Sequence, residues 1–360
     1  MKTGSVLPCS ALALLFLQAC GGDKPAAASH NPAQAPQTPA AQTPAAQTPA
    51  QPTPAAPAHP AAAAEPAKKI PRPRVDYEMV KRLFGLDPMT AEVDNPSTPE
   101  KVALGKALYH EKGLVKADVS CATCHDLSTY GVDNKPKSPG SVRNTPTTLN
   151  AFREFSSFWD GRAATVEQGV LEHGFGDEAT LVANVKAKPE LVAGFQKAFP
   201  GAADAVTGKN IGLAIGAFER TLVTKSPFDA YLDGDQRALS NEQLLGLKTF
   251  MEVGCITCHT SRLVGGAMFQ KSGLLKAYPT EDTGRFLLTK SDADKGFFKV
   301  PSLLNVEKTA PYFHDGKVAT LDDAVKTMAD LQLGRQLKPE EESALIAFLK
   351  ALTGPLPAGM

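Results

Sequence analysis

The sequence lacks an excess of charge of either sign, because lysine plus arginine and aspartate plus glutamate both total 38 in its 360 residues. It therefore gives no indication of a nucleic-acid partner, which a basic excess would favour. The chain also lacks a long apolar run, since the stretch that ends at Leu17 is too short to cross a bilayer. Its six cysteines leave no pair for a disulfide once the motifs below are assigned.

The N-terminus has the pattern of a secretory signal, with Lys2 followed by an apolar run and then Gln18-Ala19-Cys20. The junction resembles the bacterial lipobox, so we predict that residues 1–19 are a lipoprotein signal peptide and that Cys20 is the lipid attachment site. Ordinary cleavage with an unmodified Cys20 is the alternative, because small residues before the cleavage site are common to both signal types. The expected location is the periplasm, tethered to a membrane by the lipid anchor alone.

Residues 20–74 are rich in alanine, proline, glutamine and threonine. Such a composition cannot bury a core and favours an extended spacer, so this stretch is predicted to be a linker. His30 and His59 lie within it and are interpreted as bystanders. A metal-binding tail is the alternative, but two scattered imidazoles are fewer than such tracts need.

Four cysteines form two CxxCH motifs, Cys121-Ala122-Thr123-Cys124-His125 and Cys255-Ile256-Thr257-Cys258-His259. A CxxC pair can be a redox dithiol or part of a zinc site, but a histidine directly after the second cysteine in both copies indicates c-type haem attachment. Two thioethers then hold the porphyrin edge, and the next residue offers its imidazole to the iron. The sequence therefore predicts two covalently bound haems c, with His125 and His259 as proximal ligands.

The remaining chain is long enough for two modest domains, predicted as residues 75–228 and 229–360 with one haem each. Helix signals dominate, and no long alternating β pattern occurs. Thr98-Pro99 predicts a helix start, and apolar residues at helical spacing follow Ile211. A last helix is predicted between Pro339 and Gly354. The expected fold is all-α, with two cytochrome-c-like domains in tandem.

Several strings resemble the bacterial dihaem cytochrome c peroxidases, and they occur in that family's order around both haem motifs. They are Arg143-Asn144-Thr145-Pro146-Thr147, Phe158-Trp159-Asp160-Gly161-Arg162-Ala163, Gly284-Arg285-Phe286, Thr309-Ala310-Pro311-Tyr312-Phe313-His314-Asp315-Gly316 and Gln332-Leu333-Gly334. The resemblance implies an enzyme that reduces hydrogen peroxide. It implies a peroxidatic haem in the N-terminal domain and an electron-accepting haem of high potential in the C-terminal domain.

The same resemblance implies further site residues. Met328 matches the methionine opposite the second proximal histidine, with Met268 as the weaker candidate, although a buried methionine is often only core filling. Trp159 matches a residue between the two haems, and it can also be a core anchor. Asn144 and the backbone carbonyls of Thr309 and Pro311 match a calcium site, whose oxygen ligands suit a hard cation. Asn144 alone would more often be a turn residue.

Cleavage of peroxide needs a group that moves a proton between its two oxygens, and the family uses a glutamine and a glutamate. The resemblance assigns these roles to Gln168 and Glu172. Glu178 is the second candidate for the glutamate, and a solvated surface position is the other interpretation for either one.

One departure from the family concerns the loop from Asp126 to Asn144, where many members hold a second histidine that blocks the peroxidatic iron. This loop contains no histidine. We therefore expect that iron to be five-coordinate or water-bound in the oxidised protein. His173 is a possible replacement ligand from elsewhere, because histidine binds metals readily.

The electron donor is expected to be a small cytochrome c or a cupredoxin that docks transiently, and the family resemblance favours a homodimer. Two other functions stay open. The chain could be a dihaem electron carrier without catalysis, which predicts two six-coordinate haems. It could also be a relative that oxidises residues of a partner protein, although a tyrosine can replace the methionine ligand in those relatives.

Overall fold

The computed structural model describes residues 70–358, apart from residues 89, 92, 139 and 174–176. The predicted signal peptide, Cys20 and nearly all of the linker lie outside the described residues. All described residues belong to one unit, Pro66–Met360. In this described part, no helix combines the length and the apolar character that a membrane span requires.

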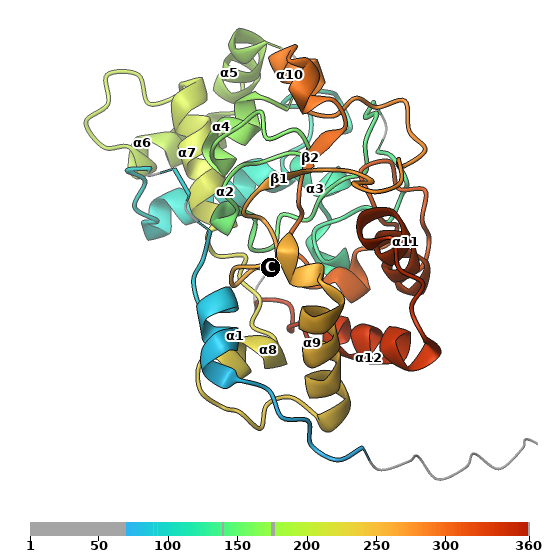
Figure 1. The fold of residues 1–360 in the computed structure, drawn as a ribbon. Helices are drawn as coiled ribbons and strands as arrows, with labels where there is room; N and C mark the ends of the chain where they lie inside the picture. Colours follow the sequence, from blue (N-terminus) through green and yellow to red (C-terminus); the bar gives the residue numbers. More distant parts are fainter. Residues whose placement is uncertain (1–69, 89, 92, 139, 174–176, 359–360) are drawn as a thin grey trace, which may run out of the picture. The chain divides into compact units, whose positions relative to one another are not determined.

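The described chain is rich in helix, as the sequence predicted, and its two β-strands have three residues each (Figure 1). Strand β1 (Phe269–Lys271) pairs with β2 (Phe297–Lys299) in antiparallel register, with Gln270 opposite Phe298. The α-helices are α1 (Tyr77–Phe84), α2 (Pro99–His110), α3 (Cys121–Cys124), α4 (Val166–Leu171), α5 (Glu178–Lys186), α6 (Pro189–Ala198), α7 (Gly208–Glu219), α8 (Pro227–Leu232), α9 (Asn241–Val253), α10 (Phe286–Thr289), α11 (Leu321–Leu333) and α12 (Pro339–Lys350).

Helices α2 and α7 form the centre of a first core. The Thr98 side chain caps α2 by accepting from the backbone N–H of Lys101, and Pro99 occupies the first helical position. The two helices cross closely, because a Cβ added to Gly105 would lie 2.0 Å from the carbonyl oxygen of Ala214. Buried side chains of this core come mainly from residues 104–222, and they are Leu104, Leu108, Tyr109, Leu114, Leu127, Leu149, Val185, Leu191, Phe195, Ala198, Val206, Ile211, Ala214, Ile215, Phe218 and Leu222.

Helices α9 and α12 form the centre of a second core with the same kind of crossing. A Cβ added to Gly246 would lie 2.0 Å from the carbonyl oxygen of Ala344. Helix α1 joins this core although it precedes the first one in sequence, since Phe84 packs edge-to-face on Phe228 of α8 at 5.5 Å. The predicted boundaries of the two domains stay a prediction.

Two stretches, residues 150–173 and 305–328, share several backbone features at a constant difference in residue number. We call them the first and second repeat segments. Asn150 and Asn305 both have φ of 61° and begin 3₁₀ turns at Ala151–Arg153 and Val306–Lys308. Each segment also has a phenylalanine with positive φ, seven residues after the first residue of the 3₁₀ turn. This phenylalanine begins a tight loop that one antiparallel bridge closes. The matching features are Phe158 and Phe313 (φ 67° and 68°), Gly161 and Gly316 (68° and 63°), bridges Ser157–Ala163 and Tyr312–Val318, and helix caps Thr165 and Thr320.

The two repeat segments meet at one buried hydroxyl. The side-chain amides of Asn150 and Asn305 each donate to Oγ1 of Thr224 at 2.9 Å. Thr224 is 2% exposed, so this bond pair satisfies its oxygen away from water.

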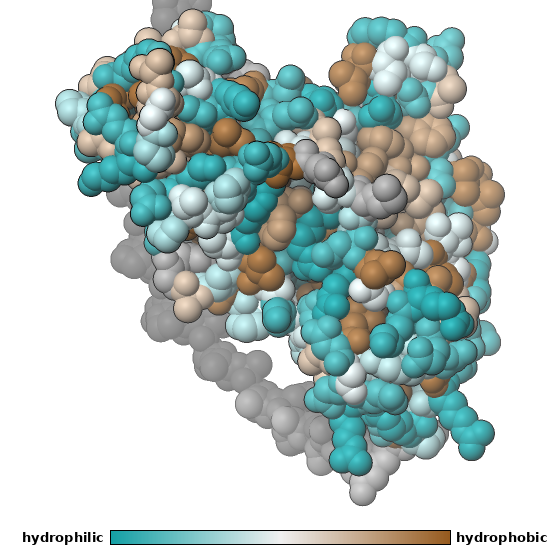
Figure 2. Space-filling view, turned by 90° about the vertical axis from the view of Figure 1, so that its left-hand side faces the viewer, coloured by the Kyte–Doolittle hydropathy of each residue, from teal (hydrophilic) through white to brown (hydrophobic). Residues whose placement is uncertain are grey.

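The face of the molecule drawn in Figure 2 is largely hydrophilic, with hydrophobic side chains in smaller groups between polar ones. This agrees with a chain that buries most of its large apolar residues in the two cores. Large hydrophobic side chains that are exposed in the described part are Met79, Leu86, Val142, Leu171, Leu274, Leu275, Leu287 and Leu288.

Candidate haem-binding sites

The first CxxCH motif folds as a single helical turn that ends at its histidine. Cys121 to Cys124 form α3, and the backbone N–H of His125 donates to the carbonyl oxygen of Cys121 at 2.8 Å. The His125 ring is buried, with Nδ1 3.3 Å from the carbonyl oxygen of Gly131. Because Nδ1 serves as the donor in that contact, the lone pair of Nε2 is left for a metal.

The second motif has the same arrangement. Its turn spans Cys255–Thr257, and Nδ1 of His259 lies 3.2 Å from the carbonyl oxygen of Val264. Gly265 follows with φ of 139°, and a Cβ there would lie 2.0 Å from the carbonyl oxygen of Pro301. A residue without a side chain is therefore required where the chain passes His259.

The protonation states of the two motif histidines suit iron binding. Burial lowers the pKa of His125, and burial lowers the pKa of His259 to about 4, so both imidazoles are neutral at pH 7. Neutral imidazole is the form that binds a metal. Burial also raises the pKa of the Cys121 thiol to about 12. All four cysteines of the described residues are free rather than cross-linked, and the two motifs thus fit covalently attached haems.

A mainly apolar cavity adjoins the first motif and is lined by both Cys121 and His125. Its polar side chains include Tyr109, His173, Glu219 and Lys299. Burial, together with the nearby Glu167 carboxylate, raises the pKa of Glu219 to about 8. An apolar enclosure with a histidine in its wall suits a flat porphyrin. The sequence reasoning did not identify Glu219 or Lys299, which lie in unremarkable helix and strand patterns.

Helix α4 turns one face to this cavity. Val166, Gly169, Val170 and His173 line the cavity, at the spacing that places residues on one side of a helix. The imidazoles of His173 and His125 lie edge-to-face, with ring centroids 5.8 Å apart and planes at 61°.

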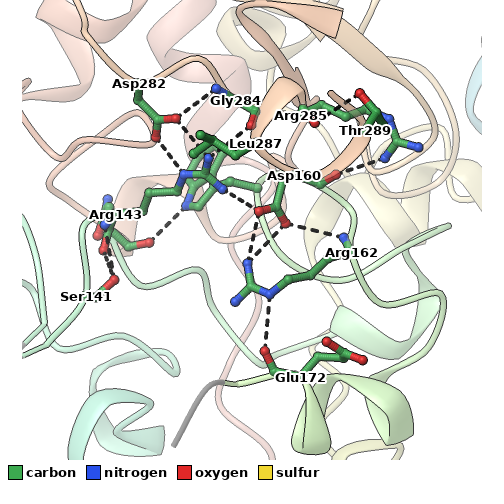
Figure 3. Close-up of polar contacts among 12 residues, drawn as sticks. Ser141, Arg143, Asp160, Arg162, Glu172, Asp282, Gly284, Arg285, Leu287 and Thr289 are labelled. Atoms are coloured by element: carbon green, nitrogen blue, oxygen red, sulfur yellow. Dashed lines mark hydrogen bonds and ion pairs between the residues drawn. The ribbon is translucent and has the colours of Figure 1, made fainter. Parts of the chain in front are cut away.

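The predicted acid–base residues lie on the other side of α4. Gln168 is exposed, and its Oε1 accepts from the backbone N–H of Ala164 at 3.0 Å. Glu172 is exposed too, and its backbone carbonyl accepts from Nε of Arg162 at 3.2 Å (Figure 3). Glu178 is exposed at the start of α5. The structure does not bring these three side chains to the cavity wall, and their catalytic roles stay a prediction.

Trp159 contacts residues of both repeat segments. Its indole Nε1 donates to the carbonyl oxygen of Asn144 at 2.9 Å, and its own carbonyl accepts from the backbone N–H of Lys299 at 2.7 Å. Its ring lies edge-to-face with His314, the matching residue of the second repeat segment, at a centroid distance of 6.3 Å.

The predicted calcium residues are partly brought together. Nδ2 of Asn144 donates to the carbonyl oxygens of Pro311 at 2.6 Å and Phe313 at 3.2 Å. Thr309 lies two residues before Pro311, and its hydroxyl donates to the carbonyl oxygen of Val306 at 3.4 Å. Calcium binding by these residues stays a prediction.

Met328 lies in α11 and is half-buried. In the constant register of the two repeat segments, it is the counterpart of His173. Met268 precedes β1, and its carbonyl accepts from the backbone N–H of Val300 at 2.9 Å.

A buried charge network joins the quoted strings around Trp159 (Figure 3). Arg143 donates to Asp160 at 2.8 Å and to Asp282 at 2.6 Å. Asp160 also accepts from Arg162 at 3.1 Å, and its carbonyl accepts from Nη1 of Arg285 at 2.9 Å. Burial alone would raise the pKa of Asp282, but the Arg143 side chain holds it below its usual value. The quoted strings contain all of these charged residues except Asp282, and they did not indicate that the residues pair.

Comparisons with known proteins agree with this geometry. Residues 99–237 match the family model described as di-haem cytochrome c peroxidase. The chain is 41% identical over 280 residues to cytochrome c551 peroxidase of Pseudomonas aeruginosa, covering 73% of this chain and 81% of the relative. It is 40% identical over 277 residues to cytochrome c551 peroxidase of Nitrosomonas europaea, covering 73% and 82%. A solved MauG-like protein associated with microbial copper homeostasis has a TM-score of 0.64 at 27% identity, covering 75% of this chain and 93% of that one.

Proposed function

This chain belongs to the di-haem cytochrome c peroxidase family, and from that premise we propose that it reduces hydrogen peroxide to water with electrons from a small cytochrome c or a cupredoxin. The observation that carries the proposal is the pair of CxxCH histidines, each with Nδ1 held by a backbone carbonyl. A haem bound there supplies an iron that changes oxidation state and binds a small ligand at an axial position.

The two haems are held by equivalent residues in this proposal. Cys121, Cys124 and His125 hold the peroxidatic haem, and Cys255, Cys258 and His259 hold the electron-accepting one. The paired helix crossings at Gly105 and Gly246 support two cytochrome-c-like domains in tandem, each around one haem.

Met328 is the proposed second ligand of the electron-accepting haem. Its place in the second repeat segment supports this assignment, because its counterpart His173 lies edge-to-face with the other proximal histidine. A thioether ligand raises the reduction potential of a haem, which suits a site that holds an electron in readiness.

Trp159 is proposed to lie on the path between the two haems. Its contacts with Lys299 and His314 on one side and with Asn144 on the other support a position between the two halves. The proposed proton-transfer roles of Glu172 and Gln168 rest on the family resemblance of the α4 region alone.

A calcium ion is proposed beside Trp159. The carbonyl oxygen of Pro311 already faces the Asn144 amide, and a rotated amide would offer Oδ1 to the ion. Carbonyl and amide oxygens are ligands that calcium accepts, and the carbonyl of Thr309 would complete the set.

The location of the protein is proposed to be the periplasm, with Cys20 as the lipid anchor and residues 20–74 as the spacer. The composition of these residues supports a flexible tether. A homodimer is the proposed assembly.

Peroxide turnover by the purified protein with a reduced cytochrome c tests the function. We expect two haems per chain by mass spectrometry and oxidation of the donor that depends on added peroxide. A protein with both haems that never oxidises the donor in response to peroxide would be a carrier instead.

A further inference from the structure

The register of the two repeat segments assigns a counterpart to every residue of the first repeat segment. The same difference in residue number that pairs Asn150 with Asn305 and Phe158 with Phe313 also pairs His173 with Met328. Helices α4 and α11 begin at matching positions, Val166 and Leu321. Two side chains that bind metals thus stand at corresponding numbers of the register, His173 just past the end of α4 and Met328 within α11.

The distance between His125 and His173 fits an iron between them. A metal–imidazole bond is about 2 Å long, so two such bonds in line separate the ring centroids by about 6 Å. The observed separation is 5.8 Å. The interplanar angle of 61° is compatible, because each ring can rotate about its own bond to the metal.

His173 is held in this position by the residues around it. The backbone N–H of Glu172 donates to the carbonyl oxygen of Gln168 at 3.0 Å, which extends the last turn of α4. Arg162 holds the Glu172 carbonyl, and the Phe158 ring packs edge-to-face on the His173 imidazole at 5.1 Å. Arg162 is itself held by Asp160 (Figure 3). Its guanidinium carbon also lies 3.5 Å from the centroid of the Phe158 ring.

Two other polar side chains of the cavity have protein partners. The Tyr109 hydroxyl donates to the carbonyl oxygen of His125 at 2.6 Å, and Lys299 forms an ion pair with Glu154.

We propose that His173 is the second axial ligand of the haem iron held by His125 in the resting oxidised protein. The proposal rests on the proposed function for the presence of that haem. It replaces the expectation of a vacant iron that followed from the histidine-free loop between Asp126 and Asn144. The imidazole that would occupy the iron comes from the end of α4 instead.

Electron paramagnetic resonance of the oxidised holoprotein tests the proposal directly. We expect low-spin signals from both haems in the natural protein. In His173→Ala, the haem held by His125 should become high-spin, and added imidazole should restore its low-spin signal. Restoration by a free ligand separates loss of the ligand from a general failure of the variant to fold.

Binding of azide provides a second readout. If His173 occupies the iron in at least nine molecules of ten, its removal should strengthen the apparent affinity for azide by at least about tenfold. His110→Ala is the matched control, because His110 is an exposed histidine outside the cavity lining. It should leave the spectrum and the azide affinity unchanged.

A high-spin haem in the resting natural protein, or an unchanged low-spin signal in His173→Ala, would overturn the proposal. Donor-dependent peroxide turnover, measured on the same samples after reduction by the donor, keeps the two claims apart. Turnover without the spectral change contradicts only the ligand assignment. The spectral change without turnover contradicts the peroxidase function and leaves the ligand assignment standing.

Discussion

The two halves of this chain share a scaffold and differ at one position of the repeat register. Each half has a glycine-mediated helix crossing, at Gly105 and at Gly246, and each proximal histidine donates Nδ1 to a carbonyl five or six residues later. At that position the first half has His173 and the second has Met328, the side chains that we propose to lie opposite the two motif histidines. In this account the shared scaffold holds both haems, and the one differing side chain distinguishes the chemistry of the two sites.

The largest expected effect comes from removing either proximal histidine. His125→Ala and His259→Ala should both lower peroxide turnover to the uncatalysed level, because each removes a ligand that the haem chemistry requires. The two variants should differ in donor oxidation. With His125→Ala the reduced donor still passes an electron to the second haem, whereas with His259→Ala it does not, and absorbance spectra of the haems distinguish the cases. Equal donor oxidation in both would contradict the division of roles.

Glu172→Gln should lower turnover by about 100-fold, the size expected for loss of a general acid–base group. Glu178→Gln is the matched control and should change turnover little. Both glutamates are exposed, so stability should be unaffected. Steady-state rates with peroxide and reduced cytochrome c provide the measurement. A selective loss with Glu178→Gln would transfer the role to the second candidate.

Gly105→Ala and Gly246→Ala test whether the two crossings are equivalent. In both variants the new Cβ would lie 2.0 Å from a backbone oxygen. Overpacking typically costs about 1–3 kcal/mol, and each variant should lower the free energy of unfolding by an amount near the upper end of that range. Gly194→Ala is the control, because its Cβ would meet only the flexible end of Leu104, at 3.0 Å. Denaturant unfolding measures all three. A tolerated alanine in one half alone would show that the halves pack differently.

Asp282→Asn should have the smallest effect, a loss of about 1.5 kcal/mol at pH 7, because Arg143 keeps its bond to Asp160. The pKa of Asp282 is lower in the folded state than in the unfolded state. Its ionised carboxylate therefore contributes to the free energy of unfolding at pH values above its unfolded-state pKa, and this contribution is lost as the pH falls through its folded-state pKa. The stability difference between the natural protein and the variant should therefore shrink on acidification below about pH 4. Urea unfolding of both proteins at pH 7 and below about pH 4 measures this difference. A stability difference that does not change with pH would contradict the prediction.

Local signals predicted much of the helical fold. The Thr98-Pro99 pair marked the first residue of α2, and Pro339 marked the first residue of α12. The spacing of Ile211, Ile215 and Phe218 identified α7. The starts of these helices and their apolar faces depend on capping residues and on apolar periodicity. Residues close together in the sequence determine both, so they can be recognised without the structure.

The face that α4 presents could not be predicted in the same way. Gln168 and His173 are both polar residues near one short helix, and only packing against the first core turns His173 inward and leaves Gln168 exposed. The repeat segments did carry a sequence signal, since Phe158-Trp159-Asp160-Gly161-Arg162 and Phe313-His314-Asp315-Gly316-Lys317 are alike. Aligning these two strings and continuing in the same register pairs His173 with Met328.

A potentiometric titration of the purified protein, followed by absorbance, tests the central claim that one scaffold holds two functionally different haems. The account predicts two well-separated one-electron steps, with the upper step belonging to the haem of His259 and moving to lower potential in Met328→His. A single step for both haems, or an upper step that is unchanged in Met328→His, would contradict it.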